Sequence, residues 1–111
     1  MKNIEIVNAL NNLISFVDAQ KRSNTAFLSV KGQFAIKSNE SSLLAKYKPY
    51  EDTLNEIKAK YEKKTDCEDY LNEIKELMDL EVEVELRKVS EEDFKDGVTI
   101  EEIMMLDFMT E

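Results

Sequence analysis

Apolar residues recur at steps of three and four along the first twenty residues, the spacing that places side chains on one face of an α-helix. The stripe consists of Ile4, Ile6, Val7, Leu10, Leu13, Ile14, Phe16 and Val17. This pattern predicts an amphipathic helix from about Asn3 to Gln20. The small polar residues of Lys21–Thr25 interrupt the periodicity and predict a loop.

A second apolar pattern is longer and follows a heptad. Its members are Ile36, Leu43, Tyr47, Tyr50, Leu54, Ile57 and Tyr61. The pattern predicts a helix over Ile36–Lys63 that is about 42 Å long, because each residue adds about 1.5 Å. Pro49 lies inside the run and is expected to bend the helix near Ala45–Pro49 without abolishing it. The heptad spacing of the tyrosines favours packing in a core over stacking on nucleic acid bases.

The start of the long helix has two interpretations. Ala26–Val30 and Gln33–Lys37 flank Lys31-Gly32, which is typical of a β-hairpin with a two-residue turn. Phe27, Val30 and Phe34 are equally spaced for one helical face. We favour a helix that begins at about Leu28.

After Lys64 the chain changes character. Thr65 and Glu68 have the spacing of a capping box, which predicts a short helix with the apolar residues Tyr70, Leu71, Ile74, Leu77 and Met78. Leu80–Val89 then alternates strictly between apolar and charged residues, which predicts a β-strand. A strand needs a hydrogen-bonding partner. Ala26–Val30 of the same chain and the same strand of a second subunit are the two candidates.

Residues 90–111 predict short helical pieces. Ser90–Asp93 begins a helical turn, Asp96-Gly97 forms a tight turn, and Thr99 and Glu102 form another capping box. That box opens a final helix with Ile100, Ile103, Met104, Leu106 and Phe108. The predicted fold is therefore mainly α and forms one domain over residues 1–111. An antiparallel helical hairpin with one long helix (1–65) is followed by a small α+β element (66–111) with one clear strand.

Charge divides the chain into two unequal parts. The 111 residues hold 24 acidic and 15 basic side chains, a formal net charge of −9. Residues 1–65 carry a net charge of +4, and residues 66–111 carry −13. A chain with this net charge repels phosphates, which argues against direct binding of nucleic acid. The charge suits solubility, a basic protein partner or mimicry of a nucleic acid surface, and a solvated acidic half that keeps the protein soluble is the simplest interpretation. The candidate partner-binding surface consists of Glu81, Glu83, Glu85, Glu91, Glu92, Asp93, Glu101 and Glu102.

The residues that most enzymes use are scarce. The chain has no His, one Cys and two Gly, so a His-assisted nucleophile and a glycine-rich phosphate loop are excluded. Cys67 is placed in the first turn of the predicted third helix, where a thiol without a His base is an ordinary small residue. Alternation alone explains the carboxylates of 81–85, so we predict no metal, no cofactor and no enzymatic activity. A single cysteine fits a reducing cytoplasm, and no apolar run is long enough for a membrane span or a secretory signal.

Gly32–Tyr61 contains Tyr-Glu at position 50 and Lys-Tyr at position 60. Together with Leu77–Phe94 and Val98–Glu111, this stretch resembles a family of small uncharacterised helical proteins from phages and prophages of low-GC Gram-positive bacteria. Gly32–Tyr61 is similar to that family's long helix, Leu77–Phe94 to its strand after a short helix, and Val98–Glu111 to its closing segment. The chain departs from the family in having no proline in the loop before the second helix. The resemblance implies a phage-encoded origin and carries over no functional residues.

These observations predict a phage protein that acts by binding another protein, in virion assembly or as a minor structural component. The alternative is an acidic inhibitor of a host defence or DNA-handling protein that presents carboxylates where phosphates would lie. Its partner is then a phage structural protein or a basic host protein. Its location is the host cytoplasm, with association to the virion in the first case. The long helix extends beyond the first helix, so part of its row of apolar heptad positions, the heptad seam, is expected to be exposed. An exposed seam predicts a homodimer unless the third or the last helix covers it.

Overall fold

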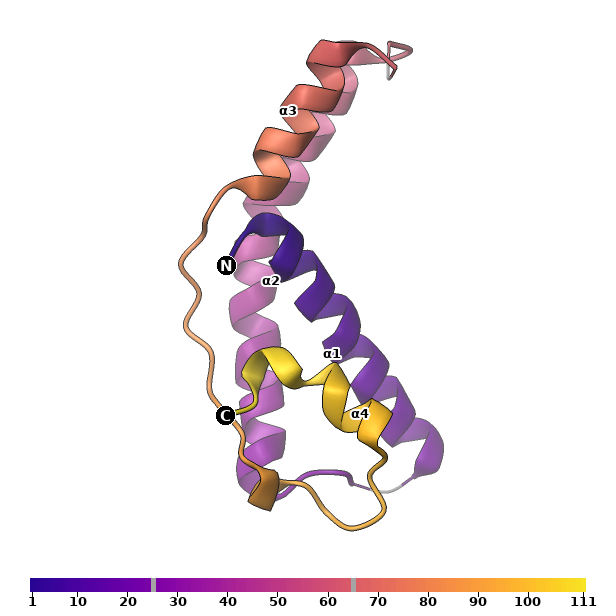
Figure 1. Cartoon of the computed structure of the whole chain (residues 1–111), viewed down its shortest axis with the longest axis vertical. Coiled ribbons are helices and arrows are strands. Elements are labelled where there is room, and N and C mark those ends of the chain that lie inside the picture. Colours follow the sequence, from indigo (N-terminus) through magenta and orange to yellow (C-terminus); the bar gives the residue numbers. More distant parts are fainter. Residues whose placement is uncertain (25, 65) are drawn as a thin grey trace.

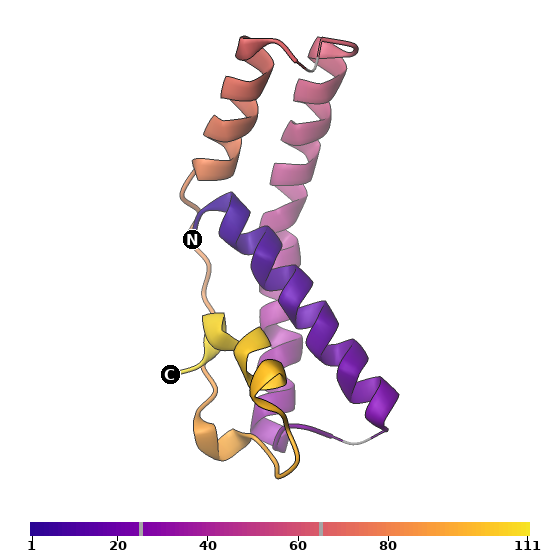
Figure 2. The same cartoon turned by 45° about the vertical axis from the view of Figure 1, so that its right-hand side comes forward.

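The computed structural model describes residues 1–24, 26–64 and 66–111 and shows a helical molecule of 50 × 27 × 19 Å (Figures 1 and 2). Two long helices form its frame. α1 covers Asn3–Ser23 and α2 covers Val30–Tyr61. They run antiparallel and cross obliquely, as the sequence predicts for the helical hairpin (Figure 2).

The ends of α1 and α2 follow from local chemistry. Asn24 ends α1 in the left-handed conformation (φ 54°), and its N–H donates to the carbonyl of Lys21. The hydroxyl of Ser29 caps α2 by accepting from the N–H of Gly32. The hairpin alternative for 26–37 is therefore wrong, and the helix begins two residues after Leu28. Thr25, the last residue of the predicted loop, lies outside the described residues.

α2 continues without interruption through Pro49, so the proline does not end the helix. A missing backbone donor in mid-helix is tolerated here because the surrounding turns are held by packing at Leu43 and Tyr50, both of which are buried. The bend predicted near Ala45–Pro49 stays a prediction.

α3, Glu68–Asp79, turns back along the distal half of α2 (Figures 1 and 2). Its N-cap residue is Cys67, and the predicted capping box begins at Thr65, outside the described residues. The heptad seam of α2 is thus covered from within the chain, by α1 near Leu43 and by α3 beyond Tyr50. An exposed seam no longer argues for a homodimer.

The last part of the chain packs against the wide end of the hairpin. It contains the 3₁₀ turn η1 (Glu91–Asp93), the helix α4 (Ile100–Met105) and the 3₁₀ turn η2 (Asp107–Met109). Thr99 caps α4 in the predicted capping box, with its hydroxyl accepting from the N–H of Glu102 at 3.1 Å. α4 lies against α1, in the space where α1 and α2 diverge (Figure 1).

The predicted strand at 80–89 is wrong for the described part of the chain. Residues 80–90 are extended, but they form isolated bridges and no ladder. Leu28, in the segment that we considered as a strand partner, instead forms an antiparallel bridge with Phe94. The alternation predicted the two faces of the segment correctly and did not predict the partners of its backbone.

The core has two clusters, and both use α1. The larger one fills the wide end of the hairpin and consists of Leu13, Phe16, Phe27, Leu28, Ala35, Ile36, Val89, Leu106 and Met109. The smaller one lies near the middle and consists of Ile6, Ala9, Leu10 and Leu43. No helix in the described residues is both long enough and apolar enough to cross a membrane.

Candidate functional site

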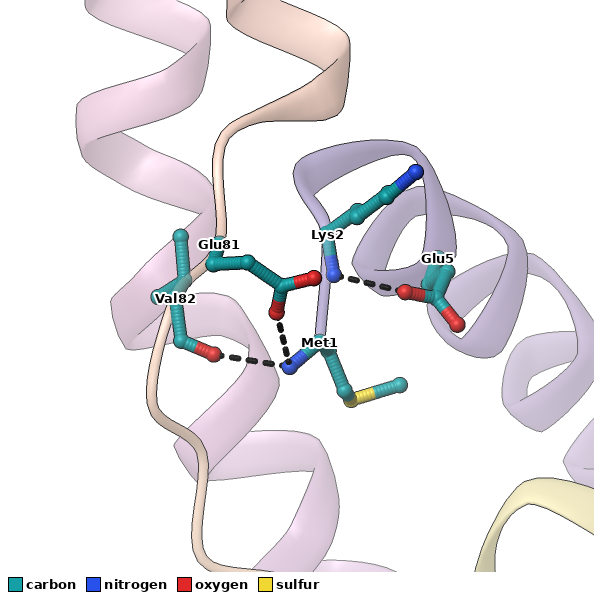
Figure 3. A network of polar contacts seen from close by, with 5 residues as sticks. All are labelled: Met1, Lys2, Glu5, Glu81 and Val82. Atoms are coloured by element: carbon teal, nitrogen blue, oxygen red, sulfur yellow. Dashed lines mark hydrogen bonds and ion pairs between the residues drawn. The ribbon is translucent and has the colours of Figure 1, made fainter.

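The most distinctive surface of the molecule is the extended segment 80–90, which connects α3 to η1 along the outside of α2 (Figures 1 and 2). Its first part is held by the start of the chain. The amine of Met1 donates to the carbonyl of Val82 at 2.9 Å and lies 3.4 Å from the carboxylate of Glu81 (Figure 3). The N–H of Val82 donates back to the carbonyl of Met1 at 2.7 Å.

A buried asparagine on α2 holds the segment further along. Asn39 is fully buried, and its amide nitrogen donates to the carbonyl of Arg87 at 2.9 Å. Its amide oxygen accepts from the N–H of Arg87 at 2.7 Å. The side-chain amide therefore pairs with the backbone of Arg87 as a neighbouring strand would.

The end of the segment pairs with the tail. The N–H of Val89 donates to the carbonyl of Met109, and the N–H of Glu111 donates to the carbonyl of Val89, both at 2.9 Å. Val89 is fully buried in the larger core cluster. The segment is thus fixed at its two ends and near Arg87 by three different parts of the chain.

Between these attachments, residues 83–86 form no hydrogen bond to any other part of the chain that the structure describes. Val84 and Leu86 are half-buried against the smaller core cluster. Glu81, Glu83 and Glu85 are exposed on the other face. The segment therefore presents a row of carboxylates on a backbone that its apolar side chains hold in place.

The remaining predicted site residues lie on other elements than the extended segment. Glu91 and Glu92 are exposed on η1, and Glu101 is exposed on α4, which packs against α1. Glu102 is half-buried and accepts at 3.1 Å from the N–H of Thr99 as part of the α4 cap.

Asp93 has to be removed from the predicted binding surface because it is buried. Its carboxylate accepts from the N–H of Ser90 at 2.9 Å and from the hydroxyl of Ser29 at 2.9 Å. These hydrogen bonds, that of the Ser90 N–H first, hold the pKa of Asp93 below its usual value. Asp93 thus ties η1 to the start of α2, which is a structural role.

The sequence did not reveal a small basic pocket beside the carboxylate row. It is lined by Lys31, Phe34, Ala35, Arg87 and Lys88. The guanidinium of Arg87 stacks over the ring of Phe34, 4.8 Å from its centroid. No signal in the sequence brings residues 31–35 next to 87–88, because Asn39 and the segment meet only in the folded chain.

No group of three or more His, Cys, Asp or Glu in residues 1–24, 26–64 and 66–111 is arranged to hold a metal ion. Cys67 is half-buried at the N-cap of α3, and its side chain does not cap the helix.

Comparison with known proteins gives no relative for this chain: no family model, no curated protein and no solved structure matches it.

Proposed function

We propose that this chain is a non-enzymatic protein that acts by binding another protein through the exposed carboxylates of residues 81–85. The observation that carries the proposal is the row of exposed carboxylates of Glu81, Glu83 and Glu85. Glu83 and Glu85 are exposed and form no ion pair with any cation of the described residues. Within the described residues Glu81 pairs only with the amine of Met1, at 3.4 Å, and the carboxylate of this pair is 71% exposed, so the contact contributes little to stability. Carboxylates left without partners attract a complementary basic surface.

The resemblance of Gly32–Tyr61, Leu77–Phe94 and Val98–Glu111 to a phage and prophage family extends this proposal to a phage-encoded protein. In that setting the partner is a phage structural protein, and the chain acts in virion assembly or as a minor structural component. The support for this part is the resemblance alone.

A second candidate function is inhibition of a host defence or DNA-handling protein. Side chains on one face of an extended segment recur every two residues, which is about 7 Å. A regular row of carboxylates at that spacing can occupy a channel that otherwise holds phosphates. This candidate differs from the first in that nucleic acid would compete with the chain for its partner.

The two functions are tested by affinity capture from phage-infected cells with a matched pair of variants. The first variant, Glu81→Gln with Glu83→Gln, removes two charges from the row. The control, Glu68→Gln with Asp69→Asn, removes two exposed charges from α3. We expect a partner that the wild type and the control retain and that the row variant loses.

The identity of the partner and its response to salt then decide between the functions. A capsid, portal or tail protein that stays bound at low and moderate salt supports the assembly role. A basic nuclease that is bound at low salt only, and that added DNA displaces, supports the inhibitor. Retention of every partner by the row variant would refute both.

A further inference from the structure

One edge of the extended segment is unpaired along its second half. In an extended backbone the N–H and carbonyl of successive residues point to opposite edges. Val82 bonds to the start of the chain on one edge. Arg87 and Val89, which differ from it by an odd number of residues, bond on the other edge to Asn39 and to the tail.

Val84, Leu86 and Lys88 belong to the first edge, and their backbone groups form no hydrogen bond within the described residues. We call residues 84–88 the free edge. A free edge of this kind is a template for the addition of another strand.

The charges beside the free edge change sign from one end to the other. Glu85 and Arg87 are neighbours on the exposed face of the segment, on either side of Leu86. Neither side chain forms an ion pair in the part of the chain that the structure describes. The guanidinium of Arg87 lies over the ring of Phe34, 4.8 Å from its centroid.

We infer that two copies of this chain pair through their free edges, antiparallel, with Leu86 opposite Leu86 of the second copy. This register places Glu85 of each copy opposite Arg87 of the other, once on each side of the twofold axis. It also pairs the backbone of Val84 with that of Lys88. The segment carries a negative charge before Leu86 and a positive charge after it. Two such segments place opposite charges across from each other only when they run antiparallel, and this self-complementarity favours a second copy of the chain as the partner.

The dimer is distinct from the proposed function, because Glu81 and Glu83 lie outside the free edge and remain exposed. A short edge gives a weak, concentration-dependent dimer. The net charge of −9 on each copy opposes association. At physiological salt that repulsion is screened beyond about 8 Å, whereas the opposed pairs are in contact.

The test uses the purified chain alone, in sedimentation equilibrium at physiological salt. Two single variants, Glu85→Arg and Arg87→Glu, each place like charges opposite one another across the axis. We expect each to dimerise roughly tenfold more weakly than the wild type. An equimolar mixture of the two variants restores the opposite pairs, so we expect heterodimers at close to the wild-type affinity.

The controls are Lys75→Glu and Glu76→Arg, which make the same charge changes on exposed positions of α3. They are expected to leave dimerisation unchanged, and far-ultraviolet circular dichroism shows that every variant is folded. A wild type that stays monomeric up to about 1 mM overturns the inference. So does a mixture that associates no better than the separate variants. Both outcomes leave the proposed function standing, because its test uses a different partner and changes Glu81 and Glu83, which take no part in the dimer.

Discussion

Replacement of Asn39 by alanine tests how the extended segment is held. Asn39 is fully buried and makes two hydrogen bonds of 2.7 and 2.9 Å to the backbone of Arg87. Each hydrogen bond contributes about 1 kcal/mol net, and the loss of buried side-chain atoms adds to the cost. We expect Asn39→Ala to lower the free energy of unfolding by about 2–3 kcal/mol. For a chain of this length the melting temperature then falls by about 8–15 °C.

The assay is urea unfolding followed by far-ultraviolet circular dichroism, with Ser41→Ala as the control. Ser41 is an exposed residue of the same helix, so its replacement should change the free energy of unfolding by less than about 0.5 kcal/mol. Asn39→Asp retains the volume and the acceptor but loses the donor, and it places a charge in a buried site. It should therefore be at least as destabilising as alanine. A value for Asn39→Ala within about 0.5 kcal/mol of the wild type would refute the role assigned to this side chain.

Two further replacements test the capping region of α2. The β-carbon added by Gly32→Ala would lie 2.9 Å from Cβ of the buried Leu28. We therefore expect urea unfolding to show a free energy of unfolding lower by about 1–2 kcal/mol, although alanine has the better helix propensity. An increase in the free energy of unfolding would contradict this packing. Asp93→Ala removes the hydrogen bonds from Ser90 and Ser29 and should cost about 1–2 kcal/mol at neutral pH. Folding lowers the pKa of Asp93 from its usual 3.8. The contribution of this carboxylate is therefore fully present above that value and is lost as the pH falls further, through the lowered pKa of the folded state. The difference between the wild type and the variant in urea unfolding should shrink as the pH is lowered below 3.8.

Side-chain periodicity predicted the helices well because it reports which face of a helix is buried. The stripe from Ile4 to Val17 became α1, which extends three residues past the predicted end at Gln20. The capping box at Thr99 forms as predicted. The box predicted from Thr65 begins outside the described residues, and the N-cap of α3 is Cys67, whose side chain makes no capping hydrogen bond.

The segment 80–89 shows where periodicity stops being informative. Alternation requires only that successive side chains face opposite ways, and the structure meets that requirement without a β-ladder. Its hydrogen bonds go to Met1, to Asn39 and to the tail. None of these partners has a sequence pattern that marks it, since a lone asparagine in a helix is ordinarily a surface residue. For the same reason the burial of Asp93 could not be predicted from a run of three acidic residues.

α3 and the part of α2 that it covers form an arm, and the rest of the molecule forms a body. The buried side chains of the arm are confined to its base, at Tyr50 and Leu77. Towards the tip the apolar contacts are half-exposed, as at Tyr61 and Tyr70, whose rings meet edge to face at 5.6 Å. The free energy of local opening therefore falls along the arm, and its helices can separate while both core clusters remain packed. We therefore expect amide hydrogen exchange to be fastest at the tip of the arm and slowest in the two core clusters.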